Sequence, residues 1–295
     1  MKYRLLIVAA TLIWGSSFVI VKGATDYLDP ALILTIRFLL AALILAVAFV
    51  RRWRLYFKKE YVGIGLLFGL ALFCAYYLQT VGVDYTTPGK NAFLTGTYWV
   101  MVPFFAWIAM RRRPTAFNVA AAALCIIGVG LISLGNEGGV NVGDVLTLAC
   151  AVFFAIHILL VSHFSQGRDI YVLTMWQFAG VGLCSLVVAL VTGADFFQLA
   201  ALDAGKVGEL AYLTVGCTAL ALLFQNIGQA HLPPASASLL LSLESPFGVL
   251  FSVLLGVEAL QAKTLLGFVL VFVAIVVSEV LPERMRARKA SPPLS

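Results

Sequence analysis

Ten apolar segments, each about as long as a helix that crosses a lipid bilayer, dominate the sequence. A transmembrane helix needs about 20 mostly apolar residues, and these runs between charged and turn-forming residues meet that requirement. The short connectors leave few residues for an aqueous domain. We therefore predict an all-α integral membrane protein with ten transmembrane helices. The predicted spans are residues 4–22, 30–50, 61–80, 91–110, 115–134, 143–163, 171–192, 208–229, 236–256 and 262–281.

The composition excludes a water-soluble fold. Of the 295 residues, 62% are hydrophobic and 12% are charged, and the mean hydropathy is +1.00. A soluble domain carries about 25% charged residues, because its surface faces water. A membrane β-barrel alternates apolar and polar residues over segments of about 10 residues. Residues 39–50 and 265–277 are instead apolar on every side, which favours helices.

The charges and cysteines limit the partners. In so apolar a chain, the net charge of +6 indicates loops that face anionic lipid rather than a nucleic-acid-binding surface. The five cysteines lie inside apolar runs without a CxxC motif or a Cys/His cluster, so no metal or other cofactor is expected. A GxxxxGK[ST] motif for ATP is also absent from the sequence. The expected partners are the lipid bilayer and a small-molecule substrate, with protons as a candidate coupling ion.

Lysine and arginine predict the orientation. With both termini in the cytoplasm, fifteen lysines and arginines fall on the inner side, and Arg37 lies inside a span. Four lysines fall on the outer side: Lys22, Lys90, Lys206 and Lys263. Positive residues concentrate on the cytoplasmic side of multi-pass proteins. The bias requires an even number of spans, and it predicts a bacterial inner-membrane protein with cytoplasmic termini. The first span has no small-x-small cleavage site at its end, so we expect it to be retained.

The two halves of the chain resemble each other. The alignment that matches Asp29 with Asp169 also matches Arg37 with Gln177, and after one short insertion three further pairs match: Gln79 with Gln225, Gly82 with Gly228, and Pro88 with Pro234. Each half holds five spans, an odd number, so the second half enters the membrane upside down. Such inverted repeats are typical of secondary transporters. The predicted units are residues 1–136, residues 137–284, and a cytoplasmic tail of residues 285–295.

Several motifs resemble those of the EamA family of the drug/metabolite transporter superfamily. They are Leu12–Phe18 (LIWGSSF), Asp29-Pro30 with Arg37-Phe38, Gly82–Ala92 (GVDYTTPGKNA), and Leu243–Phe247 (LESPF) followed by Gly256–Glu258. The resemblance covers residues 1–282, although Ser245 interrupts the commoner Leu-Glu-Pro. It implies a basket of two inverted five-helix repeats that exports small metabolites. The aromatic residues further resemble those of YddG-type amino-acid exporters, while other family members carry drugs, nucleosides and other metabolites.

Three ionisable residues inside predicted spans are candidates for transport. A charge at the bilayer centre costs about 2.5–3.5 kcal/mol on insertion scales, so such residues mark cavities or pairs. Glu244 is a candidate to neutralise a substrate amine or take up a proton, with a structural helix–helix pair as the alternative. His157 is a candidate for a pH gate or a carboxylate contact, with a packing histidine as the alternative. For Arg37 we favour a structural role over attraction of a substrate carboxylate.

Aromatic residues inside the spans indicate a planar or cationic substrate, because they stack on rings and attract ammonium groups. Trp14, Tyr98 and Trp99 lie near the middle of their spans and are the main cavity candidates. Tyr77 is a further substrate-binding candidate. For Tyr77, as for Tyr76 and Trp176, anchoring at the membrane interface is the alternative.

Polar stripes and two turns complete the candidate site. Asn91, Thr95 and Tyr98 share one helical face. A second polar patch consists of Gln225, Asn226 and Gln229. A third consists of Ser238, Ser242 and Ser245. Such stripes line a path or join helices. Thr87-Pro88-Gly89 and Pro233-Pro234 open two spans, either as gate ends or as plain hairpin turns. The substrate-binding residues that we predict are Trp14, Tyr77, Thr95, Tyr98, Trp99, His157, Gln225, Ser242 and Glu244.

These features predict a secondary-active or facilitative exporter of small metabolites, foremost aromatic or amphipathic amino acids, that works by alternating access. An exporter of drugs, nucleosides or other metabolites with the same fold is the alternative. An intramembrane enzyme that uses Ser16 or Ser17 with His157 is a distant one, because nothing marks an oxyanion hole. A channel is disfavoured by the inverted repeat. No enzymatic activity is therefore expected.

Overall fold

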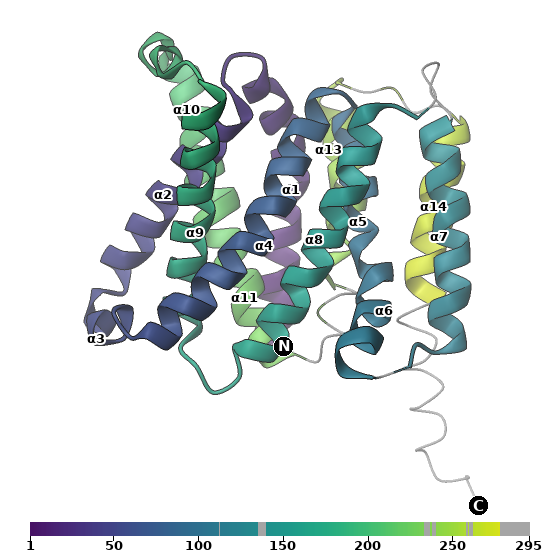
Figure 1. Ribbon diagram of the computed structural model, residues 1–295. Helices are drawn as coiled ribbons and strands as arrows, with labels where there is room; N and C mark the ends of the chain where they lie inside the picture. The colour runs from purple at the N-terminus through teal and green to yellow at the C-terminus, as the bar shows by residue number, and fades with distance from the viewer. Residues whose placement is uncertain are drawn as a thin grey trace, which may run out of the picture.

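The structure is a computed structural model that describes residues 1–111, 113–134, 140–232, 237, 240–257, 259 and 262–277. Over these residues the chain is helical, and no strand occurs among them. The helices run roughly along one common direction, and the N-terminus lies at one end of the bundle (Figure 1). The predicted boundary between the repeats and the predicted tail both lie outside the described residues.

Within the described ranges, seven helical segments are long and apolar enough to cross a membrane. They are α1 (Lys2–Thr25), α2 (Pro30–Ala48), α4 (Lys59–Asp84), the run of α5 (Pro88–Gly96) and α6 (Tyr98–Met110), α8 (Val142–Phe164), α9 (Ile170–Thr192), and the run of α10 (Ala204–Tyr212), η3 (Leu213–Leu220) and α11 (Ala221–His231). Three further helices contain shorter apolar stretches of 10–17 residues: α7 (Ala116–Leu134), α13 (Glu244–Leu254) and α14 (Ala262–Ile275). The remaining elements are η1 (Val50–Arg52), α3 (Trp53–Tyr56) and η2 (Phe196–Ala201). Every predicted span overlaps one of the seven segments or one of the three further helices.

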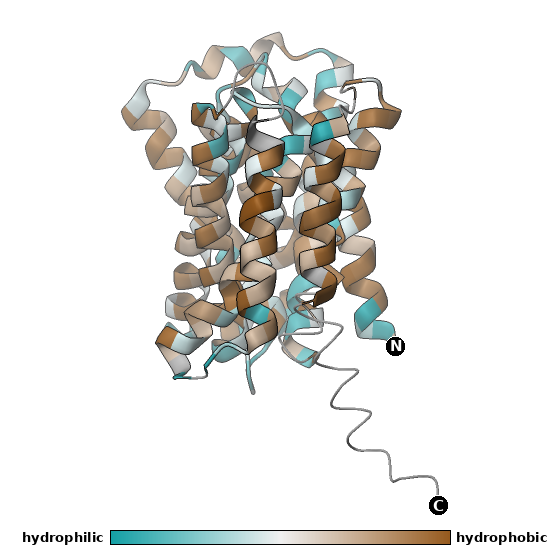
Figure 2. Ribbon diagram, turned by 90° about the vertical axis from the view of Figure 1, so that its right-hand side faces the viewer, coloured by the Kyte–Doolittle hydropathy of each residue, from teal (hydrophilic) through white to brown (hydrophobic). Residues whose placement is uncertain are grey.

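The outer surface of the bundle is apolar where a bilayer would surround it. Leu43, Val47, Ile126 and Val191 are all more than half exposed. Figure 2 shows hydrophobic residues along the outward faces of the helices and hydrophilic residues mainly toward the two ends. Only hydrocarbon accepts so much exposed apolar surface, and the helices satisfy their own backbone groups there. The chain is therefore built as a multi-pass membrane protein.

Capping residues decide where several helices begin. The Asp29 side chain accepts a hydrogen bond from the backbone of Ala31 at the start of α2, and Asp169 does the same for Tyr171 and Val172 at the start of α9. These carboxylates satisfy amide groups that have no partner inside the helix. The two aspartates that match between the halves of the sequence thus have the same role.

Glycines bring the helices into close contact. A Cβ atom at Gly82 would lie 2.8 Å from Thr147 Oγ1 of α8, and one at Gly228 would lie 2.4 Å from Ile7 Cγ1 of α1. Small residues allow such approaches between membrane helices. Ile7 matches Thr147 in the same alignment that matches Asp29 with Asp169, so the matched glycines make equivalent contacts in the two halves. The pairs α2 with α9 and α7 with α14 also pack closely, and α7 and α14 stand together at one edge of the bundle (Figure 1).

Gly69 provides a test of this packing. A Cβ at Gly69 would lie 2.7 Å from the Gln177 carbonyl oxygen and 2.9 Å from Gly180 Cα. Both are backbone atoms, which cannot change rotamer to relieve the clash. Gly63 of the same helix has open space around its Cβ position. We expect Gly69→Ala to lower the free energy of unfolding by about 1–3 kcal/mol, as overpacking does. Gly63→Ala should leave it nearly unchanged. Equal thermal unfolding of the two variants in detergent would contradict the close approach of α4 and α9.

Candidate functional site

The interior of the bundle contains many polar and aromatic side chains in addition to aliphatic ones. Polar side chains that are almost fully buried come from α1, α2, α4, α5, α8, α9, η3, α11 and α13. Groups of this kind are expensive inside a membrane protein and face its interior or a cavity. They form three groups along the bundle, which we call layers. One lies near the end opposite the N-terminus and includes Lys90 and Asp144, one lies in the middle and includes Arg37, Tyr98 and Glu244, and one lies nearer the N-terminal end and includes Asn226 and Gln177.

Glu244 and Tyr98 face each other in the middle layer. The Tyr98 hydroxyl donates to Glu244 Oε2 at 3.4 Å, although the two residues lie in different halves of the chain. Both are buried, with 3% of Tyr98 and 8% of Glu244 exposed. Within the described part of the chain no basic side chain lies within ion-pair distance of Glu244. The carboxyl group is therefore held by a phenol and has no cation opposite it.

Both residues stand at interruptions of a helix. α5 ends at Gly96 and α6 begins at Tyr98, while α13 begins at Glu244 after a turn at Ser242 and Leu243. Tyr98 and Glu244 match each other in the alignment that also matches Gly82 with Gly228, so the two interruptions are equivalent. Broken helices line the binding sites of many transporters, because they expose backbone groups and helix ends to the cavity.

Arg37 is the second buried charge of the middle layer, with 1% of the residue exposed. Its Nε donates to Thr218 Oγ1 at 3.2 Å, and its guanidinium carbon lies 5.6 Å from the ring centroid of Tyr76. Thr218 belongs to η3, a π-helical segment in which its hydroxyl also donates to the Leu213 carbonyl. Such segments occur frequently at functional sites. The indole of Trp14 donates to the Cys217 carbonyl of the same segment at 2.8 Å.

Aromatic rings connect the two buried charges. Tyr76 packs edge-on against Phe154 at 5.3 Å between centroids, and Phe154 lies 5.9 Å from Tyr98. The sequence of contacts therefore runs from Arg37 through Tyr76, Phe154 and Tyr98 to Glu244. This arrangement suits a ligand that carries an aromatic ring and polar groups of opposite charge.

The layer opposite the N-terminal end is closed by a buried ion pair. Lys90 Nζ lies 2.7 Å from Asp144 Oδ2, and 2% and 0% of the two side chains are exposed. Next to this pair, Asn91 donates to Thr147 Oγ1 at 2.8 Å. From the sequence Lys90 was expected in an outer loop, and the pair was not foreseen. The sequence feature that could have indicated the position of Asp144 is the pattern Asn-x-x-Asp at Asn141–Asp144, which forms a capping box and anchors Asp144.

The layer nearer the N-terminal end consists of neutral polar groups. Asn226 of α11 donates to Thr174 Oγ1 at 2.9 Å and to Gln177 Oε1 at 3.1 Å. His157 lies edge-on to Phe68 at 6.2 Å, and neither ring nitrogen has a hydrogen-bond partner among the described residues. Gln225 and Gln229 are also buried there. This layer has spare donors and acceptors that water or a ligand can use.

The remaining predicted residues differ in their surroundings. Thr95 accepts a hydrogen bond from Gln79 at 3.1 Å, Trp99 is fully buried beside Tyr98 in α6, and Ser242 is buried at the turn before α13. Tyr77 is half-buried, stacks on Phe73, and packs against Ala31, Leu32 and Ala189. No contact in the described structure joins Tyr77 to the two buried charges. Pro233, Pro234 and Ser238 lie outside the described residues.

The enzyme alternative gains no geometric support. Ser17 donates to the Trp14 carbonyl, and Ser16 donates to the Ile13 carbonyl and contacts the Tyr212 hydroxyl. Neither serine contacts His157. Among the described residues, no three His, Cys, Asp or Glu side chains stand close enough together to hold a metal ion.

A small polar cavity adjoins Arg37. It has a volume of about 10 Å³, which suffices for one water molecule. Its wall consists of Ser17, Phe18, Val21, Arg37, Tyr76, Gln79, Val83 and Asn91. A metabolite does not fit this space.

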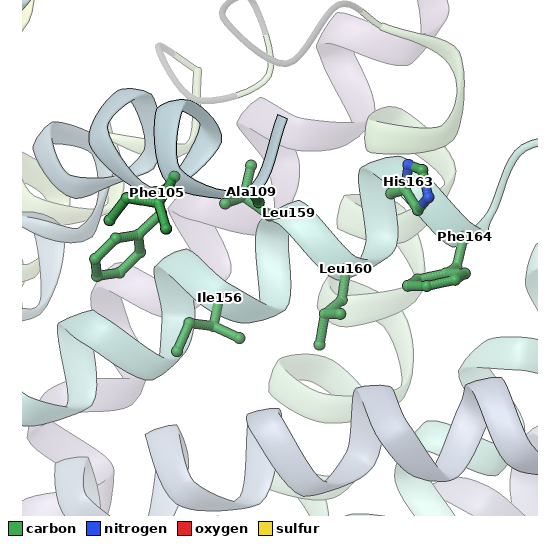
Figure 3. A pocket seen from close by; sticks show the side chains of 8 residues that line it. Phe105, Ala109, Ile156, Leu159, Leu160, His163 and Phe164 are labelled. Carbon is green, nitrogen blue, oxygen red and sulfur yellow. The ribbon is translucent and has the colours of Figure 1, made fainter. Parts of the chain in front are cut away.

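Two larger hollows are apolar. One, of about 350 Å³, lies between α6 and α8, with Phe105, Ile156 and Phe164 in its wall and His163 at its end (Figure 3). The other, of about 460 Å³, lies between α6 and α7 and contains Thr97 and Cys125. They offer few polar groups to a charged metabolite, so we place the candidate site at the two buried charges instead.

Comparisons with known proteins agree with this architecture. The model of the EamA-like transporter family matches residues 1–134 and residues 141–279. An uncharacterized transporter of Archaeoglobus fulgidus is 32% identical over 90% of this chain and 82% of its own length. The uncharacterized transporter YyaM of Bacillus subtilis is 22% identical over 88% of each chain. One solved crystal structure, 17% identical, covers 96% of this chain and 98% of its own, with a TM-score of 0.71.

Removal of Asp144 tests the buried ion pair. We expect Asp144→Asn to lower the free energy of unfolding by about 3–5 kcal/mol, because it leaves the Lys90 ammonium buried without its counter-ion. The matched control is Asp203→Asn, which breaks the exposed pair of Asp203 and Lys206 at 3.5 Å and should cost less than about 1 kcal/mol. Similar unfolding of both variants in detergent would show that Lys90 and Asp144 are not held in a dry environment.

Proposed function

Because this chain belongs to the EamA-like transporter family, we propose that it exports small amphipathic metabolites, foremost aromatic amino acids. The central site would open alternately to the two sides of the membrane. Curated relatives are themselves named as transporters. The substrate class rests on the geometry of the middle layer.

The proposal includes ten transmembrane helices arranged as two inverted repeats, residues 1–136 and 137–284. Four observations support it: the two separate matches of the family model, the equivalent caps at Asp29 and Asp169, the equivalent glycine contacts, and the two equivalent helix interruptions. In folds built from inverted repeats, the substrate site lies near the midplane, where the two repeats meet. In this arrangement both termini face the cytoplasm of a bacterial cell, and Lys90 and Asp144 face outward.

The observation that carries the substrate class is the pairing of Glu244 with Tyr98 without a buried cation. A buried carboxylate without a counter-ion is costly, and a substrate ammonium group removes that cost when it binds. The rings of Tyr98, Phe154 and Tyr76 add surfaces on which an aromatic side chain stacks and a cation is attracted. An aromatic amino acid offers both groups.

Alternating access follows from the layers around this site. The ion pair of Lys90 and Asp144 closes one end, and the cavity next to Arg37 is too small for a substrate. Rocking of the two repeats about the glycine-packed interfaces would open one end at a time. Release to the outer side then requires that Lys90 and Asp144 separate.

Transport in liposomes tests the substrate class. Purified protein should exchange labelled phenylalanine, tyrosine or tryptophan across the membrane and show stimulation by unlabelled amino acid on the other side. Glu244→Gln should lower the rate at least tenfold, since a loss of about 1.4 kcal/mol in transition-state stabilisation has that effect. The matched control Glu209→Gln alters a carboxylate that accepts a hydrogen bond from Tyr27 at an exposed site, and it should transport normally.

Two results would contradict this proposal. Exchange of nucleosides or cationic dyes without exchange of amino acids would assign the chain to another substrate class of the same fold. Flux without stimulation from the opposite side would indicate a pore instead of a carrier.

The pH dependence of exchange tests a proton role for Glu244. If its carboxyl group takes up and releases a proton in each cycle, the rate of the wild-type protein changes with pH, and Glu244→Gln abolishes that dependence. The measurement is the initial exchange rate between pH 5 and pH 9 in liposomes with equal pH on both sides. The same pH profile in wild-type protein and Glu244→Gln would remove the proton role and leave amine recognition in place.

A further inference from the structure

Arg37 is buried as a cation without an anionic partner. Its only hydrogen bond within the described residues goes from Nε to the neutral hydroxyl of Thr218, and none of the ion pairs there includes it. The rings of Phe38 and Tyr76 lie 5.8 and 5.6 Å from the guanidinium carbon and offer a partial compensation. A guanidinium group inside a membrane protein is otherwise paired or faces a water-filled space.

Arg37 borders a small polar cavity in the interior of the bundle. The residue forms part of the wall of the small polar cavity, together with Ser17, Gln79 and Asn91. Asn91 Oδ1 is buried and has no hydrogen-bond partner in the described part of the chain. The cavity thus contains a buried cation and spare hydrogen-bonding capacity, although it holds only about one water molecule in this conformation.

The sequence favoured a structural role for Arg37, but on its surroundings in the structure we propose instead that Arg37 binds the carboxylate group of the transported molecule. A planar guanidinium donates two parallel hydrogen bonds to a carboxylate, which matches its geometry better than any neutral group does. Thr218 holds Nε of Arg37 and thereby orients the two terminal nitrogens. Carboxylate binding also supplies a counter-ion, which none of the described side chains provides at this position.

The position of Glu244 extends this assignment to a zwitterion and rests on the proposed function. Tyr76 lies against the Arg37 guanidinium, and Tyr98 donates to the Glu244 carboxylate. The two charges therefore border one region, and the aromatic rings of Tyr76, Phe154 and Tyr98 lie between them. An aromatic amino acid presents its carboxylate to Arg37, its ammonium group to Glu244, and its ring to the aromatic residues.

The repeat provides a suitable substitution. Gln177 matches Arg37 in the alignment of the two halves, is fully buried in α9, and accepts a hydrogen bond from Asn226. A glutamine therefore fits the equivalent place in the other half of the fold. Arg37→Gln removes the charge while it retains a side chain that this architecture already accommodates.

Binding of ligands with single charged groups tests the carboxylate site. In lipid nanodiscs, calorimetric titration of wild-type protein should detect 3-phenylpropionate, and the affinity should fall at least tenfold for the neutral amide of the same molecule. Arg37→Gln should weaken 3-phenylpropionate binding at least tenfold, whereas Arg37→Lys should weaken it less. Phenethylamine, which carries only the amine, should bind to Arg37→Gln within twofold of wild type and lose affinity in Glu244→Gln.

The outcomes distinguish this inference from the proposed function. Equal binding of the acid and its amide to wild-type protein, or no binding of the acid, overturns the role of Arg37 even if Arg37→Gln fails to fold. Equal binding of the acid to wild type and a folded Arg37→Gln overturns it too. Carboxylate binding that depends on Arg37 without any exchange of amino acids would refute only the proposed function. Exchange of tyrosine and its decarboxylated amine at equal rates would refute only the carboxylate site.

Discussion

The cost of polar groups inside a membrane is the constraint on which the rest of this structure depends. The outer surface can consist of leucine, isoleucine and valine, but every buried charge needs a counter-ion, a hydrogen-bond partner or a ligand. Lys90 and Asp144 solve the problem with each other at 2.7 Å. Arg37 and Glu244 do not, since each has only a neutral partner among the described residues. This contrast distinguishes the ion pair from the binding site that we propose.

Helix irregularities place those charges. The interruption before Tyr98, the turn before Glu244 and the π-helical segment around Thr218 all border the middle layer. A regular helix uses its carbonyl groups within itself, whereas these segments present groups such as the Cys217 carbonyl to the Trp14 indole. Three glycines then allow regular helices to approach closely enough to surround this layer: Gly69, Gly82 and Gly228. Rigid contacts and irregular segments together suit a site that must change shape.

Much of the architecture could be predicted from the length of the apolar segments and from the similarity of the two halves. The positions of the apolar helices followed from segment length. The alignment of the halves paired Asp29 with Asp169 and Gly82 with Gly228, but only the structure showed that the aspartates cap helices and that the glycines make close contacts. The site was predictable only in part. Eight of the predicted site residues are buried, as their positions within spans indicated: Trp14, Thr95, Tyr98, Trp99, His157, Gln225, Ser242 and Glu244. Tyr77 contacts Phe73 instead of either buried charge, and Lys90 was missed because a lysine near a span end ordinarily reaches water.

The sequence by itself determined that the chain is helical, apolar outside and related to membrane transporters, because hydropathy over about 20 residues and local capping depend only on neighbouring residues. Only the tertiary structure decided which buried charges are paired. Lys90 and Asp144 are distant in the sequence and meet because α5 and α8 pack together, while Arg37 meets a hydroxyl of η3 and no carboxylate in the described structure. Pairing depends on distances between helices that no local pattern encodes.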